Sequence, residues 1–99
     1  LVELGAQHAI VSLGGDGALL FTPNEVIYAP PLSGKVANPV GAGDSMVAGF
    51  VGTFIRTGDA LEAFRVAVAA GTATAFSPDI ATTKEIEAQL GRVVLEKIE

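Results

Sequence analysis

The chain has 99 residues, and its 6 Lys and Arg against 11 Asp and Glu give a formal net charge of −5. This length allows one domain at most. The acidic balance excludes a general electrostatic attraction to nucleic acid or to an anionic membrane. The chain has no cysteine, so it forms no disulfide and holds no Cys-ligated metal. No apolar run approaches the roughly 20 residues of a membrane helix, and we expect a cytoplasmic protein.

Both ends of the chain carry weak structural signals. Leu1–Gln7 resembles the tail of a helix already under way, and the first residue is not Met. We therefore expect a piece of a longer protein. Near the other end, Val93–Leu95 predicts a short extended tail.

Three short apolar runs follow the first residues. They are Ala9–Leu13, Ala18–Phe21 and Val26–Ala29, separated by turn-forming residues at Gly14–Gly17 and Thr22–Glu25. This pattern predicts three strands joined by tight turns. The first run is apolar throughout, so we expect it inside the sheet.

The period of the apolar residues changes after Val40. Gly41–Arg56 is apolar nearly all round a helix, which predicts a buried helix, and Gly49 and Gly52 would allow another element to approach closely.

Two capping patterns predict further helices. Asp59 with Glu62 three residues later marks a helix that stops before Pro78, and Thr82 begins the same pattern for a helix that ends near Gly91. Strands that lead into helices indicate an α/β fold, with strands inside and helices outside.

The chemistry concentrates in Asn38–Ser45, where an extended segment passes through glycines into the apolar helix. The backbone N–H groups of Gly41, Ala42 and Gly43 would lie at the positive end of that helix, which favours an anion. Phosphoryl transfer develops negative charge that such donors stabilise. Asp44 is placed to accept the proton of an attacking hydroxyl. An ordinary strand-to-helix turn is the alternative interpretation of these residues.

The run Asn38–Phe50 resembles, along its whole length, the C-terminal signature of the PfkB carbohydrate kinases, also called ribokinase-like. The resemblance implies a three-layer α/β/α fold, of which residues 1–99 would be the C-terminal, ATP-binding and catalytic part. It implies that Asp44 is the catalytic base and contacts the substrate. The amides of Gly41, Ala42 and Gly43 would be the anion hole.

A second segment, Val11–Ala18, resembles the family's strand and glycine turn beside the nucleotide phosphates. By this resemblance Ser12 and Gly14 would contact the nucleotide and Gly17 would serve the turn. A plain hairpin turn explains the same glycines, because such turns need positive φ.

The small residues Ala70, Gly71 and Thr74 resemble the wall on which the family lays the adenine, although a stripe of small residues also permits close helix packing. Lys35 lies in the loop before the signature and is a secondary phosphate contact, with a solvated loop side chain as the alternative. His8 is the only histidine, so we expect a structural or exposed role and no metal site. Turn chemistry explains Asp16, and we assign it no role.

Residues Ala73–Ser77 and Ile80–Thr82 look most like family members that convert D-fructose 1-phosphate to the 1,6-bisphosphate with ATP and Mg²⁺. Kinases of tagatose 6-phosphate, or of another sugar or nucleoside, are the alternatives. The family's chain is longer and most of its sugar site would lie upstream, so we expect this chain alone to be inactive. A homodimer of the full-length enzyme is compatible with the resemblance.

Two hypotheses from other classes remain. A Rossmann-like binding module would use Gly14–Gly17 as its phosphate loop, but a β-like run follows these residues where that fingerprint requires a helix. A non-catalytic assembly module would use the apolar helix as its contact face.

Overall fold

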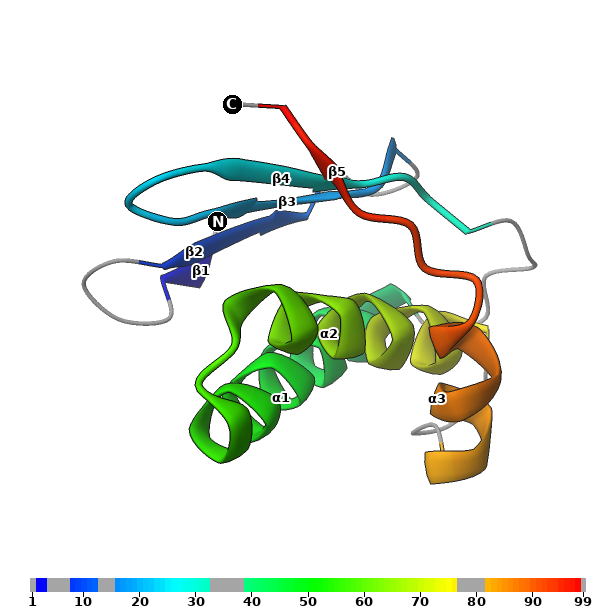
Figure 1. Ribbon diagram of the computed structural model, residues 1–99. Coiled ribbons are helices and arrows are strands. Elements are labelled where there is room, and N and C mark those ends of the chain that lie inside the picture. Colours follow the sequence, from blue (N-terminus) through cyan, green and yellow to red (C-terminus); the bar gives the residue numbers. More distant parts are fainter. Residues whose placement is uncertain (1, 4–7, 13–15, 33–38, 77–81, 99) are drawn as a thin grey trace.

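Strands and helices occupy separate stretches of the chain, with one short strand after the helices. The computed structural model describes residues 2–3, 8–12, 16–32, 39–76 and 82–98. The elements are β1 (Val2–Glu3), β2 (Ala9–Ser12), β3 (Ala18–Phe21), β4 (Val26–Ala29), α1 (Pro39–Thr57), α2 (Ala60–Ala75), α3 (Thr83–Leu90) and β5 (Glu96–Lys97). The sheet is one layer, and α1 and α2 lie together on one side of it (Figure 1). The predicted α/β class is confirmed.

The sheet is antiparallel throughout and follows the order β1-β2-β3-β4-β5. The three predicted strands are confirmed, and β2 lies inside the sheet as expected. Ile10, Leu20 and Ile27 stand opposite one another on β2, β3 and β4. Because side chains alternate along a strand, all three point to the helices, where they are buried with Phe50 and Phe64 in one core.

The two chain ends differ from the sequence predictions. The helix tail predicted over Leu1–Gln7 is wrong where the structure describes it, because β1 is a strand that pairs with β2. Without β1, the outer edge of β2 would carry unpaired backbone groups, and Val2 and Glu3 pair with some of them. At the other end, Val93–Leu95 has no regular structure. The strand comes just afterwards, as β5, which pairs with β4.

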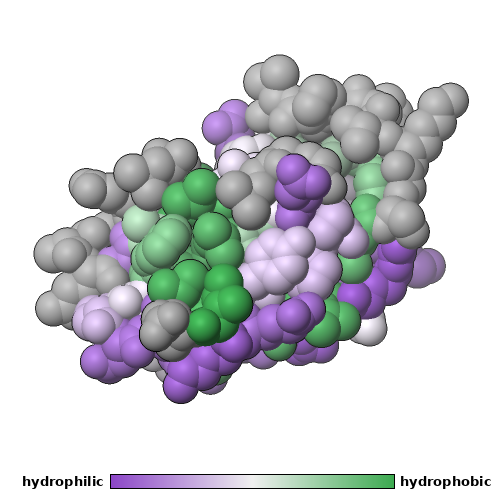
Figure 2. Space-filling view, turned by 90° about the horizontal axis from the view of Figure 1, so that it is seen from above, coloured by the Kyte–Doolittle hydropathy of each residue, from purple (hydrophilic) through white to green (hydrophobic). Residues whose placement is uncertain are grey.

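The other face of the sheet is also apolar. Strand alternation turns Leu19 and Phe21 of β3, and Val26 and Tyr28 of β4, away from the helices. Figure 2 looks onto this face from above and shows apolar side chains gathered there. None of the described helices covers this face (Figure 1). The described residues therefore form two layers of the three that the sequence predicts.

Helix α1 is buried on one side only. Phe50 is 1% exposed and Thr53 3%, whereas Val51 is 40% and Ile55 80% exposed. The prediction of a helix buried all round is therefore wrong for the described chain. The reason is that α1 packs along one side against α2, and no other described element covers its opposite face.

Small residues bring α1 and α2 close together. A Cβ atom added at Gly49 would lie 3.3 Å from the Cα of Ala67 and 3.3 Å from the Cβ of Ala70, whereas at Gly52 it would meet nothing within 4 Å. The predicted close approach is therefore confirmed at Gly49 and wrong at Gly52.

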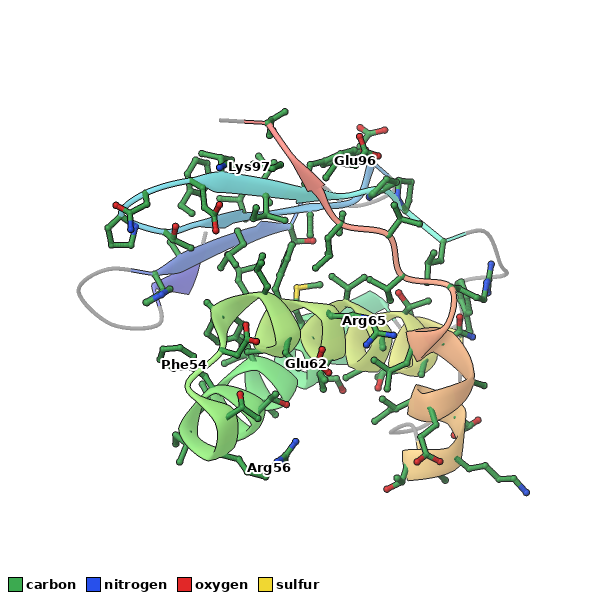
Figure 3. All side chains as sticks on the ribbon, in the orientation of Figure 1. Phe54, Arg56, Glu62, Arg65, Glu96 and Lys97 are labelled. Atoms are coloured by element: carbon green, nitrogen blue, oxygen red, sulfur yellow. The ribbon has the colours of Figure 1, made fainter. Side chains whose placement is uncertain are left out.

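Helix α2 begins at the predicted cap. Asp59 accepts hydrogen bonds from the backbone N–H groups of Leu61 and Glu62. In a complete capping box the Glu62 side chain would accept from the N–H of Asp59. Here that N–H donates to Thr57 Oγ1 instead, at 3.1 Å. Glu62 lies instead 3.5 Å from the guanidinium of Arg65, on the same helix (Figure 3).

Helix α3 carries the complete capping box. The side chain of Thr82 accepts from the N–H of Glu85, and the Glu85 carboxylate accepts from the N–H of Thr82. The helix ends at Gly91, as predicted. Arg65 donates to the carbonyl oxygen of Leu90 and so ties α2 to the end of α3. Among the helices of the described ranges, none combines the length and the apolar character needed to span a membrane.

The two glycines of α1 provide a matched test of the helix contact. Replacing either by alanine should gain up to about 1 kcal/mol of helix propensity. In Gly49→Ala the new methyl group crowds α2, at a cost of about 1–3 kcal/mol. We expect Gly52→Ala to raise the free energy of unfolding, and Gly49→Ala to lie about 1–3 kcal/mol below it, both measured by urea denaturation. Equal gains would contradict the close contact.

Candidate functional site

Two glycine-rich segments and the end of α2 lie toward the same end of the molecule. Strand β2 ends there at Ser12, the turn at Asp16–Gly17 leads into β3 there, and α1 begins there (Figure 1). Because α1 and α2 run in opposite directions, the C-terminal turns of α2 lie beside the first turns of α1. Both segments that the sequence assigns to a phosphate site therefore occupy one end of the fold.

The first glycine turn is held from the neighbouring strand. Gly17 has φ +103°, which confirms the predicted need for glycine, and a Cβ atom there would collide with the backbone oxygen of Ala29. The hydroxyl of Tyr28 donates to the backbone oxygen of Asp16 at 2.7 Å. Ser12 is exposed at the end of β2. The expected nucleotide contact at Gly14 lies outside the described residues.

The second segment forms the first turns of α1. The helix begins at Pro39, two residues earlier than the sequence predicts. Proline suits the first helical position, since its missing N–H would have no partner inside the helix. Gly43 and Asp44 are exposed, and a Cβ atom at Gly43 would meet nothing within 4 Å. The described residues therefore leave the Gly43 position open, next to Asp44 in the chain.

The carboxylate of Asp44 has no hydrogen-bond or ion-pair partner within the described residues. Of the basic residues, Arg56 lies at the opposite end of α1 (Figure 3). Lys35, the secondary phosphate contact, lies outside the described residues. An exposed carboxylate without a protein partner is available to accept a proton.

The position at which α1 begins determines which backbone N–H groups are available for the predicted anion hole. In an α-helix each N–H donates to the carbonyl four residues earlier. With Pro39 as the first residue, the amide of Gly43 faces the Pro39 carbonyl and is used inside the helix. An anion hole made of the amides of Gly41, Ala42 and Gly43 therefore requires the first turn to open.

The small residues of α2 face α1. Gly71 is buried, and a Cβ atom there would lie 3.2 Å from the backbone oxygen of Ala42 and 3.3 Å from the Cε of Met46. Ala70 and Thr74 are also buried. Close helix packing, the alternative given for these residues, is thus present. All three residues lie against protein here, and their contact with an adenine base stays a prediction.

The sequence did not predict the hydrogen bond between Ser45 Oγ and Thr74 Oγ1, 2.7 Å apart, which joins the start of α1 to α2. A signal was present in the sequence, because Ser45 and Thr74 are each a hydroxyl residue on a helix face that otherwise holds apolar and small residues. The structural role expected for His8 is confirmed, since its ring packs against those of Phe50 and Phe54. Within the described ranges, no three His, Cys, Asp or Glu residues gather to hold a metal ion.

Comparison with known proteins identifies the family. The model of the "pfkB family carbohydrate kinase" matches residues 1–87. This chain belongs to the PfkB family of carbohydrate kinases.

Two curated relatives indicate where in the family the chain lies. It is 47% identical over 98 residues to a 1-phosphofructokinase of Bacillus subtilis, covering 99% of this chain and 32% of the relative. It is 38% identical over 87 residues to a D-tagatose-1-phosphate kinase of Bacillus licheniformis, covering 88% of this chain and 29% of the relative. The chain thus spans about a third of the length of the relatives it matches.

Solved structures share the fold. A Staphylococcus aureus protein named provisionally as a phosphofructokinase has a TM-score of 0.89 and 46% identity, covering 96% of this chain and 31% of that chain. A provisionally named ribokinase II of Escherichia coli, solved with ATP and Mg²⁺, has a TM-score of 0.76 and 26% identity, covering 89% of this chain and 30% of that chain. The ribokinase-like fold is confirmed.

The glycine turn can be tested through backbone conformation. Gly17→Ala places a side chain at a positive φ and against the Ala29 carbonyl, and we expect a loss of at least about 2 kcal/mol in the free energy of unfolding. Gly91→Ala is the matched control. Its φ is −68° and a Cβ atom there meets nothing within 4 Å, so we expect a gain of about 0.4–1 kcal/mol. Chemical denaturation measures both, and an unchanged Gly17→Ala protein would refute the constraint.

Proposed function

We propose that the complete enzyme containing this chain transfers the terminal phosphate of ATP to a hydroxyl group of a sugar phosphate. D-Fructose 1-phosphate is the substrate that we favour, and fructose 1,6-bisphosphate is then the product. Membership of the PfkB family supports the reaction class. The name of the Bacillus subtilis relative supports the substrate.

The observation that carries the proposal is the position of Asp44. Its carboxylate is exposed in the second turn of α1, next to the open space at Gly43. A phosphate bound at this helix start and a sugar hydroxyl in line with it would place that hydroxyl within reach of the carboxylate. The hydroxyl oxygen then forms the new P–O bond, ADP leaves with the electrons of the broken bond, and Asp44 takes the proton.

The helix amides would stabilise the charge of the transferring group. We propose that the first turn of α1 opens so that Gly41, Ala42 and Gly43 direct their N–H groups to the phosphate. Ser12 and the turn that ends at Gly17 would lie along the rest of the nucleotide.

Mg²⁺ is the metal ion expected with ATP, and it would neutralise phosphate charge when bound. The open position at Gly43 would leave room for a phosphate group. The described residues gather no set of metal ligands of their own, so we propose that the phosphates and the rest of the enzyme hold the ion. Because the sugar site would also lie in that remainder, we expect this chain alone not to turn over. We propose a cytoplasmic enzyme, which could be a homodimer.

A second substrate is supported by a specific observation. One relative is named D-tagatose-1-phosphate kinase. Tagatose 1-phosphate differs from fructose 1-phosphate only in the configuration at C4. Tagatose 6-phosphate, the alternative substrate suggested by the sequence, carries its phosphate on C6 and not on C1. The substrate assay therefore includes all three sugar phosphates.

The non-enzymatic alternatives are less well supported. The glycine turn leads into β3 and not into a helix, which disfavours a dinucleotide-binding fingerprint. An assembly module would use the apolar face of α1, but it would not require Asp44.

The proposal is tested by Asp44→Asn in the complete enzyme. We expect kcat to fall by about 10²–10⁴-fold, because general-base catalysis contributes this much. ATP affinity, measured by calorimetry, should stay unchanged. Turnover is followed as ADP release with fructose 1-phosphate, tagatose 1-phosphate, tagatose 6-phosphate, fructose 6-phosphate and ribose.

Asp59→Asn is the matched control for this substitution. It removes the same charge at the start of a helix, and asparagine preserves the cap. We expect its kcat to equal that of the parent enzyme. Full activity in Asp44→Asn, or no turnover of any sugar by the parent, would reject the kinase mechanism and favour the assembly module.

A further inference from the structure

We infer that Thr74 is a positioning residue for the catalytic base, acting through its hydrogen bond with Ser45. This inference rests on the proposed role of Asp44. It gives Thr74 a role other than the adenine contact that the sequence suggests.

The hydrogen bond joins two helices at their interface. Ser45 Oγ and Thr74 Oγ1 are 2.7 Å apart and belong to residues 29 positions apart in the chain. Thr74 is 1% exposed, so water does not compete for this bond. A hydrogen bond shielded from water has a low-dielectric surrounding, which strengthens it. This bond therefore holds α1 and α2 in one relative arrangement.

Three contacts line up on one face of α1. Ala42 and Met46 meet the Gly71 position of α2, and Ser45 bonds to Thr74. Residues three and four apart lie on one face of a helix. The first two turns of α1 are therefore fixed to α2 by two packing contacts and one directional bond.

Asp44 lies on another face of the same turns. Each residue advances by about 100° around the helix axis, so Asp44 is about 200° from Ala42 and points away from α2. This agrees with its exposure. Any rotation of α1 about its axis turns the carboxylate by the same angle. The packing contacts with Gly71 tolerate small rotations, whereas a hydrogen bond has a narrow range of distance and angle. The Ser45–Thr74 bond therefore sets the direction of the Asp44 carboxylate.

The test compares Thr74→Val with Thr74→Ser in the complete enzyme. Valine keeps the shape and removes the hydroxyl, and we expect kcat to fall by about 10- to 100-fold, because a small misplacement of a catalytic group costs this much. The KM for ATP should stay within about twofold, since under this inference Thr74 does not contact the adenine of ATP. Serine keeps the hydroxyl and should restore most of kcat.

Two further variants separate positioning from simple loss of stability. Ser45→Ala removes the same bond from the other side, and the double variant with Thr74→Val should be no worse than either single one. Thr53→Val removes a hydroxyl from the other described buried threonine, which lies on α1 nine residues after Asp44. It should leave kcat per folded molecule unchanged.

Each outcome decides the inference. A rise in the KM for ATP at unchanged kcat would overturn it in favour of an adenine contact. Unchanged kcat in both Thr74→Val and Ser45→Ala, or an equal fall in Thr53→Val, would overturn it as well. If Asp44→Asn retains full turnover, the proposed function itself fails. If Asp44→Asn is inactive while Thr74→Val matches the parent, only the positioning role fails.

Discussion

The close contact between α1 and α2 is the constraint on which the rest of the structure depends. At Gly49 of α1 and at Gly71 of α2 the other helix leaves no room for a methyl group, because an added Cβ atom would lie 3.3 Å from the Cα of Ala67 or 3.2 Å from the backbone oxygen of Ala42. Interiors are packed so densely that even one added methyl group is felt. The contact fixes the position of α1 relative to α2. The Ser45–Thr74 bond crosses the same interface and adds a directional contact beside Asp44.

The sequence predicted local structure well because local rules decide it. Strand positions followed from apolar runs bounded by turn residues, and the caps at Asp59 and Thr82 followed from side chains that bond to nearby backbone groups. The strand at Val2–Glu3 was not predictable in the same way, because two residues pair with β2 only through tertiary contact. Burial of α1 also depends on what surrounds the helix. Ile55 is apolar, yet among the described residues nothing covers it.

The residues of the candidate site were predictable from the signature, but their arrangement was not. Gly43 and Asp44 are exposed, but they lie one turn inside α1, because the helix begins at Pro39. The Ser45–Thr74 bond depends on how two helices meet, which no spacing along the chain reveals. Thr74 could not be distinguished from a ligand contact by residue type alone, since small polar residues serve both roles.

The bond from Tyr28 to the turn has a consequence for sequence variation. Its acceptor is the backbone oxygen of residue 16, so the Asp16 side chain takes no part in it. Position 16 can therefore change freely without loss of this bond. Position 28 requires an aromatic side chain long enough to span the gap and ending in a donor, and tyrosine alone among the common aromatic residues carries a hydroxyl there. Related sequences that keep this turn should thus vary at 16 far more readily than at 28.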